Sequence, residues 1–113
     1  MTQAIVSLGN PKTISVTKAL AAAGNYDAND VLSESASAGT AWTFSGAALR
    51  NGGFGVIVKV VALLETTALT PGITLYLFKA TPTSALNDNV ANTAVLHADA
   101  ANYLGRIDIP ALS

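Results

Sequence analysis

The run of residues 54–66 constrains the fold more than any other stretch, because its apolar side chains recur at every second position. A period of two is that of a β-strand, whose side chains alternate between two faces; a helix repeats about every 3.6 residues. All even positions from 54 to 64 are apolar, and the odd positions mix Ile57, Val61 and Leu63 with Lys59 and Glu65. The pattern predicts a strand with one buried face and a second, partly covered face.

A second strand is expected at residues 73–79, directly after the turn signal Pro71-Gly72. Its aliphatic side chains face one way and its aromatic ones the other: Ile73, Leu75 and Leu77 against Tyr76 and Phe78. Because the runs 54–66 and 73–79 follow each other across a turn, we expect them to pair as an antiparallel hairpin.

Further alternating runs occur at residues 13–17, 40–44 and 103–109, separated by Gly, Pro and Asn. Helical signals are confined to single turns, at residues 46–50 and 98–104. There is no alternation of strands and helices that would indicate a parallel sheet. We therefore predict one all-β domain, an antiparallel β-sandwich or jelly roll with short helical turns at most. Residues 1–25 form an N-terminal arm and the first strands of that unit, and residues 26–113 form its body.

Charge and cysteine content exclude several classes of function. Only 12% of the residues are charged, so part of the surface must be Ser, Thr, Asn and Gly or be covered by another chain. The six basic residues are scattered along the sequence, which disfavours nucleic acid as a partner. Apolar stretches are too short to span a membrane, and no signal peptide is visible. Without cysteine there is neither a disulfide nor a thiolate metal site, which suits folding in a reducing cytosol.

The residues that carry chemistry do not form a catalytic pattern. His97 is the sole histidine and no nucleophile motif accompanies it, so we expect no enzyme activity and no cofactor. Asn87, Asp88 and Asn89 are a weak candidate for a calcium site, against the alternative of side chains that fix the loop backbone. The glycines after Asn51 indicate a tight turn rather than a phosphate-binding loop, because a strand follows them.

Six short segments, in order, resemble small virion proteins of tailed bacteriophages. They are Tyr26-Asp27-Ala28-Asn29-Asp30-Val31-Leu32, Arg50-Asn51-Gly52-Gly53-Phe54-Gly55-Val56-Ile57, Leu75-Tyr76-Leu77-Phe78 with Thr81-Pro82-Thr83, Asn87-Asp88-Asn89, and Gly105-Arg106-Ile107-Asp108-Ile109-Pro110-Ala111-Leu112. The likeness covers most of the chain from Tyr26 onward and leaves the first 25 residues unmatched. The resemblance implies a capsid decoration, or cement, protein. Such a protein is a β-sandwich that is made in the host cytoplasm, binds the outer capsid surface as a dimer or trimer and clamps neighbouring capsomers.

Two groups of residues are candidates for contacts with the major capsid protein or with further copies of the chain. Ile5, Val6 and Leu8 form an apolar arm suited to strand addition. The mixed face of the 54–66 run is the candidate homo-oligomer contact: Ile57, Lys59, Val61 and Leu63. An alternative function is a carbohydrate- or receptor-binding module of a phage tail, for which Trp42 would be the aromatic platform.

Overall fold

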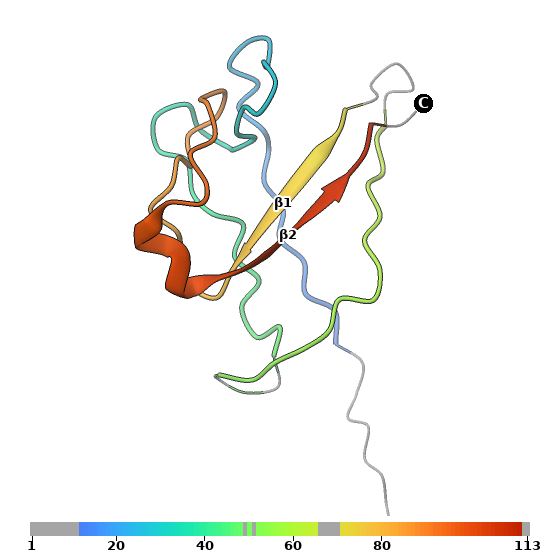
Figure 1. The fold of residues 1–113 in the computed structure, drawn as a ribbon. Helices are drawn as coiled ribbons and strands as arrows, with labels where there is room; N and C mark the ends of the chain where they lie inside the picture. The colour runs from blue at the N-terminus through green and yellow to red at the C-terminus, as the bar shows by residue number, and fades with distance from the viewer. Residues whose placement is uncertain (1–11, 49, 51, 66–70, 112–113) are drawn as a thin grey trace, which may run out of the picture.

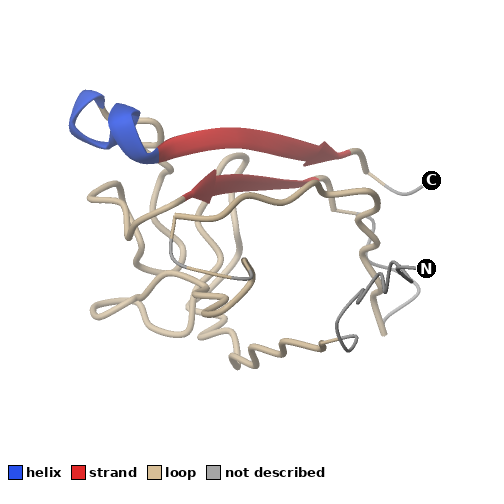
Figure 2. Ribbon diagram, turned by 90° about the horizontal axis from the view of Figure 1, so that it is seen from below, coloured by secondary structure: helices blue, strands red, loops and turns tan. Residues whose placement is uncertain are grey.

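The computed structural model describes residues 12–48, 50, 52–65 and 71–111. Strand β1 (Ile73–Phe78) pairs with strand β2 (Tyr103–Ile109), and a 3-10 helix, η1 (His97–Asn102), leads into β2 (Figure 1). The two strands form one layer, with the loops on one side of it (Figure 2). The described chain is mostly non-helical, and its sheet is a two-stranded antiparallel one, in agreement with the coarse part of the all-β prediction.

The strand pairing differs from the expected hairpin. β1 pairs with β2, in a register that places Ile73 opposite Ile109 and Leu75 opposite Ile107, so the predicted pairing of residues 73–79 with residues 54–66 is wrong. Apolar side chains alternate in β2 as well, and cross-strand pairs of matching side chains stabilise a sheet. Because the entropic cost of closing a loop rises only slowly with its length, a more distant strand can displace the nearest one.

The ends of this pair are tied by side chains as well as by the backbone. The Thr74 hydroxyl lies 3.0 Å from a carboxylate oxygen of its cross-strand partner Asp108. At the other end, the rings of Phe78 and Tyr103 pack at a centroid distance of 5.5 Å with a tilt of 53°, a favourable aromatic arrangement. The final strand predicted at residues 103–109 is confirmed, and η1 covers most of the helical turn expected just before it.

Residues 54–65 are not part of a strand, and they are not buried. The exposed fraction is 94% for Phe54, 92% for Val58 and 89% for Leu63, so the prediction of one buried face is wrong. The physical reason is a missing neighbour: this segment makes no backbone hydrogen bond to any other described residue beyond the turn at its start. That turn is as predicted, since Gly53 N–H donates to Arg50 O at 2.9 Å around Gly52, whose φ is +72°.

No hydrophobic side chain of the described residues is buried. The buried side chains are polar: Ser33, Ser84, Asp88 and Asp99. Asp99, in η1, accepts hydrogen bonds from the Thr83 N–H at 2.8 Å and from the Ser84 N–H at 3.1 Å. These bonds fasten η1 to the preceding loop, so the loops are held by polar contacts.

Two smaller expectations have different outcomes. In residues 13–17, Ile14 and Val16 are half-buried while their neighbours are exposed, as the alternation predicted, although no strand is formed there. The helical turn predicted at residues 46–50 is not formed by the described residues of that range, and Ser45 and Gly46 form a non-helical turn. No helix within the described ranges is long and apolar enough to cross a membrane.

Candidate partner-binding groove

The 54–65 segment exposes both of its faces. Of the residues expected to form an interface, Ile57, Lys59, Val61 and Leu63 are all exposed. Sequence reasoning placed the even positions in the core, yet Phe54, Val56 and Val58 are exposed as well. Exposed apolar patches of this size are common at surfaces that bind another protein, a membrane or a ligand, which makes the segment a candidate binding surface. Ile5, Val6 and Leu8 lie outside the described residues.

An open groove of about 1760 Å³ extends along this segment and along β2. One part of its lining comes from residues 52–60 and another from residues 104–110, and Phe44 and the end of β1 line it as well. In Figure 1 the later, yellow-green part of the segment 54–65 lies on the β2 side of the strand pair. Because β2 pairs only with β1 in the described structure, its second edge carries backbone N–H and C=O groups without a strand partner.

The groove gathers most of the positive charge of the chain. Five of the six basic residues line it: Lys12, Arg50, Lys59, Lys79 and Arg106. All five are exposed, and the one acidic residue in the lining is Asp108, which forms a 3.3 Å ion pair with Arg106. These residues are far apart in the sequence, so their convergence could not be read from it. The result is an apolar groove with a basic rim.

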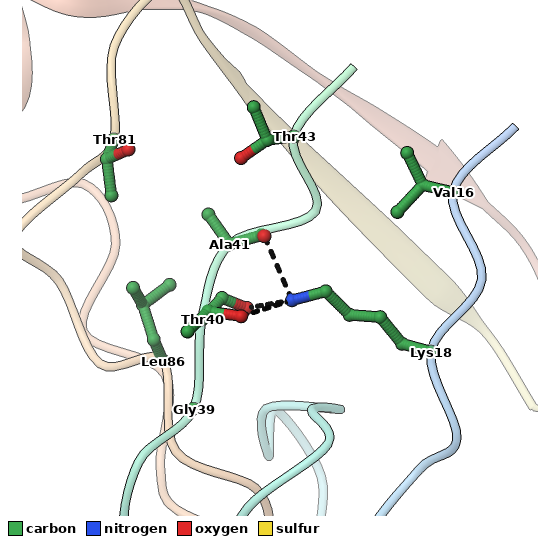
Figure 3. Close-up of a pocket in the computed structure, with 8 residues that line it drawn as sticks. All are labelled: Val16, Lys18, Gly39, Thr40, Ala41, Thr43, Thr81 and Leu86. Carbon is green, nitrogen blue, oxygen red and sulfur yellow. Dashed lines mark hydrogen bonds between the residues drawn. The ribbon is translucent and has the colours of Figure 1, made fainter. Parts of the chain in front are cut away.

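The sixth basic residue, Lys18, is held in a network of its own beside a smaller hollow of about 550 Å³ (Figure 3). Its ammonium donates to the carbonyl oxygens of Thr40 at 2.9 Å and Ala41 at 3.0 Å and forms a 3.2 Å ion pair with Glu34. The same ammonium lies 5.8 Å from the ring centroid of Trp42, within the range of a cation–π contact. Trp42 is 41% exposed, so part of this residue is accessible to solvent.

Hydrogen bonds hold the pKa of Glu34 far below its usual range. The largest cause is the hydrogen bond from the Thr40 hydroxyl, followed by the backbone N–H of Glu34 itself and the hydroxyl of Ser33, and together they lower the pKa to about 2. The carboxylate therefore stays charged and paired with Lys18 over the ordinary pH range. The network therefore serves to hold the fold together, because the charged groups of Lys18 and Glu34 already have hydrogen-bond partners within the protein.

Asp88, in the candidate calcium triplet, is engaged with the protein backbone. Its carboxylate accepts the N–H of Ser33 at 2.7 Å, the N–H of Ala23 at 3.2 Å and the hydroxyl of Tyr26 at 2.9 Å. Burial raises its pKa, but these three bonds outweigh burial and the pKa lies below its ordinary value. The geometry favours the alternative in which the side chain fixes the loop. The neighbouring Asn87 also binds the backbone, since its side-chain oxygen accepts a hydrogen bond from the Gly39 N–H at 2.9 Å.

Other candidate chemistry is not brought together by the fold. His97 starts η1 and is exposed, with no side-chain hydrogen bond to the described part of the chain. In residues 12–48, 50, 52–65 and 71–111, no group of three or more His, Asp or Glu side chains is placed to hold a metal ion. The groove is thus the feature of these ranges best suited to a functional role. No family model matches the chain, and comparisons with curated proteins and with solved structures also gave no match.

Proposed function

We propose that this chain is a non-enzymatic structural protein of a tailed bacteriophage, a decoration protein on the outer surface of the capsid. The observation that carries the proposal is the exposed apolar segment 54–64, which a protein acting alone in water would be expected to bury. The low content of charged residues supports the proposal, because interfaces of permanent assemblies are more apolar than interfaces of transient complexes. The resemblance of its segments to small virion proteins supplies the kind of assembly.

The finer fold in this proposal is a single antiparallel β-sandwich or jelly roll. Support comes from the antiparallel pair β1–β2 together with alternating runs at residues 13–17 and 54–65 that lack strand neighbours in the described chain. Such runs acquire their hydrogen bonds when another chain provides the adjacent strand. A structure of the chain in its assembled form tests this, since residues 54–65 should then belong to a sheet.

Decoration would stabilise the capsid by mass action. A copy that binds only the mature lattice lowers the free energy of that lattice, and many copies acting together make the attachment durable. The partners are the major capsid protein and further copies of this chain, as a dimer or trimer, with synthesis in the host cytoplasm. Clamping needs no reacting group. A purely structural role is consistent with the two buried carboxylates, Asp88 and Asp99, because both accept hydrogen bonds from backbone N–H groups.

Quantitative mass spectrometry of purified virions tests the proposal directly. The copies of this chain are compared with the copies of the major capsid protein in the same particles. We expect a ratio of the same order of magnitude, because a decoration protein follows the capsid lattice. A handful of copies per particle would instead assign the chain to the tail or a vertex, and its absence would refute the virion role.

A second candidate function is a carbohydrate- or receptor-binding module of a phage tail. The observation that favours it is the partial exposure of Trp42, whose ring lies beside Lys18 of the smaller hollow, since sugars stack on exposed aromatic rings. Binding to a glycan array that is lost in Trp42→Ala would support this function. If the Trp42→Ala variant binds to virions in the same copy number as the unmodified protein, the result would support the decoration function instead.

A further inference from the structure

The basic groove has the features of an acceptor for a β-strand. Its lining includes residues 104–110, which span most of β2, and among the described residues β2 has a strand neighbour on one side only. Exposed edges of this kind bind extended peptides through backbone hydrogen bonds, while pockets alongside select alternate side chains. The groove is also lined by residues 54–60, an apolar stretch that makes no backbone hydrogen bond to another described residue.

Charge decides which strand fits. The five exposed cations at the groove face one carboxylate, Asp108, which is already paired with Arg106. A basic strand would be repelled, and a neutral strand would leave the excess positive charge uncompensated. Alternating acidic and apolar side chains would satisfy both parts of the groove, with apolar side chains against Phe54 and Val58 and acidic ones toward Lys59 and Lys79.

The geometry points to an extended, acidic and apolar segment of another protein as the occupant of this groove, added as a strand along β2. This inference rests on the proposed function and deepens it, because it states the chemistry of the partner segment through which the capsid would be bound. Residues 54–60 would gain strand neighbours in the complex, which accounts for the unpaired state of the strongest alternating run in the sequence.

Binding of a synthetic peptide to the full-length protein tests the inference. The probe is a fluorescein-labelled peptide of about eight residues, alternating Glu and Val, a typical strand length. Fluorescence anisotropy should show saturable binding that weakens as salt is raised to about 0.5 M, because the cations and carboxylates are exposed to solvent. Peptides alternating Lys and Val, or Ser and Val, should bind at least about tenfold more weakly.

Two variants separate an effect of the groove from one of net charge. Lys59→Gln should weaken binding of the Glu-Val peptide about two- to fivefold, the range for one exposed charge pair. Adding Ala36→Lys to that variant restores the net charge at an exposed position outside the groove and should not restore binding. Amide hydrogen exchange of the complex should slow at residues 54–60 and 104–109.

Three results would overturn the inference: no binding of the Glu-Val peptide, unchanged binding in Lys59→Gln, or tighter binding of a single-stranded oligo(dT) than of the peptide. The last would identify nucleic acid as the partner of the basic rim. These failures are distinct from failure of the proposed function, which the copy number in virions tests independently. A chain abundant in virions that does not bind the peptide would refute only the inference about the groove.

Discussion

The backbone N–H of Ser33 donates a 2.7 Å hydrogen bond to the carboxylate of Asp88, fifty-five residues further along the chain. Both residues are 1% exposed, and they are the most completely buried side chains of the described structure. The Tyr26 hydroxyl and the Ala23 N–H bind the same carboxylate. A single acidic side chain thus joins the segment at residues 23–33 to the loop that contains residue 88.

Asp88→Asn should destabilise the fold, because the amide has one acceptor oxygen and its NH₂ group would face the donors that now bind the carboxylate. We expect the melting temperature to fall by roughly 5 °C or more. Thermal unfolding followed by circular dichroism measures it. The control is Asp27→Asn, an exposed aspartate whose side chain makes no hydrogen bond within the described residues. An equal effect of the two substitutions would contradict the role given to Asp88.

Gly39→Ala should destabilise the fold for a steric reason. A Cβ at this position would lie 1.9 Å from Leu86 O and 2.6 Å from Ser33 Oγ, and the Leu86 oxygen belongs to the backbone and cannot swing away. We expect a loss of at least about 2 kcal/mol in the free energy of unfolding, measured by urea denaturation. Gly55→Ala is the matched control, since nothing lies within 4 Å of its added Cβ, and it should cause no loss. If Gly39→Ala leaves the free energy of unfolding unchanged, the close packing around Gly39 would be disproved.

Acid should weaken the network at Glu34. The pKa of this carboxyl is lowered from 4.5 to about 2 in the folded protein, chiefly by the Thr40 hydroxyl. A lowered pKa means that folding favours the charged form, so the contribution is complete above about pH 4.5 and is lost as the pH falls toward 2. The melting temperature of Glu34→Gln should therefore lie below that of the unmodified protein at pH 7, and the difference should shrink between pH 4.5 and 2. A difference that does not vary with pH would refute this account.

Leu63→Ser should weaken self-association and leave the folded unit unchanged, because Leu63 is almost fully exposed and loses no internal contact. If this side chain is buried between copies, the dissociation constant should rise at least about tenfold. Analytical ultracentrifugation over a concentration series measures it. Leu20→Ser, at an exposed leucine outside the groove and the 54–64 segment, should have no effect. Unmodified protein that stays monomeric at high concentration would exclude the contact itself.

Deletion of residues 1–11 should abolish binding to capsids without unfolding the body. The expected reason is loss of the apolar arm at Ile5, Val6 and Leu8, which would add as a strand to the capsid or to a neighbouring copy. Co-sedimentation with undecorated capsids measures binding, and circular dichroism of the same preparation verifies the fold. Saturation of capsids by the truncated protein would show that the arm is not needed.

Local features were predictable from the sequence to the extent that neighbouring residues decide them. The alternation of Tyr103, Ile107 and Ile109 with Arg106 and Asp108 predicted β2, and the glycines at residues 52 and 53 predicted the turn that closes on Arg50. Each depends on side-chain period or on backbone conformations that glycine adopts freely, and both are properties of a few consecutive residues.

Pairing, exposure and charge placement were decided only in three dimensions. Several alternating runs compete for β1, and the pairing with β2 left residues 54–65, the strongest of them, without the strand partner that their pattern predicts. Five basic residues that are scattered in the sequence line one groove. Two aspartates, Asp88 and Asp99, are buried, and their carboxylates bind N–H groups of residues far away in the sequence. These outcomes depend on distances between remote segments. Period and turn chemistry carry no information about such distances, because loop closure discriminates only weakly between alternative partners.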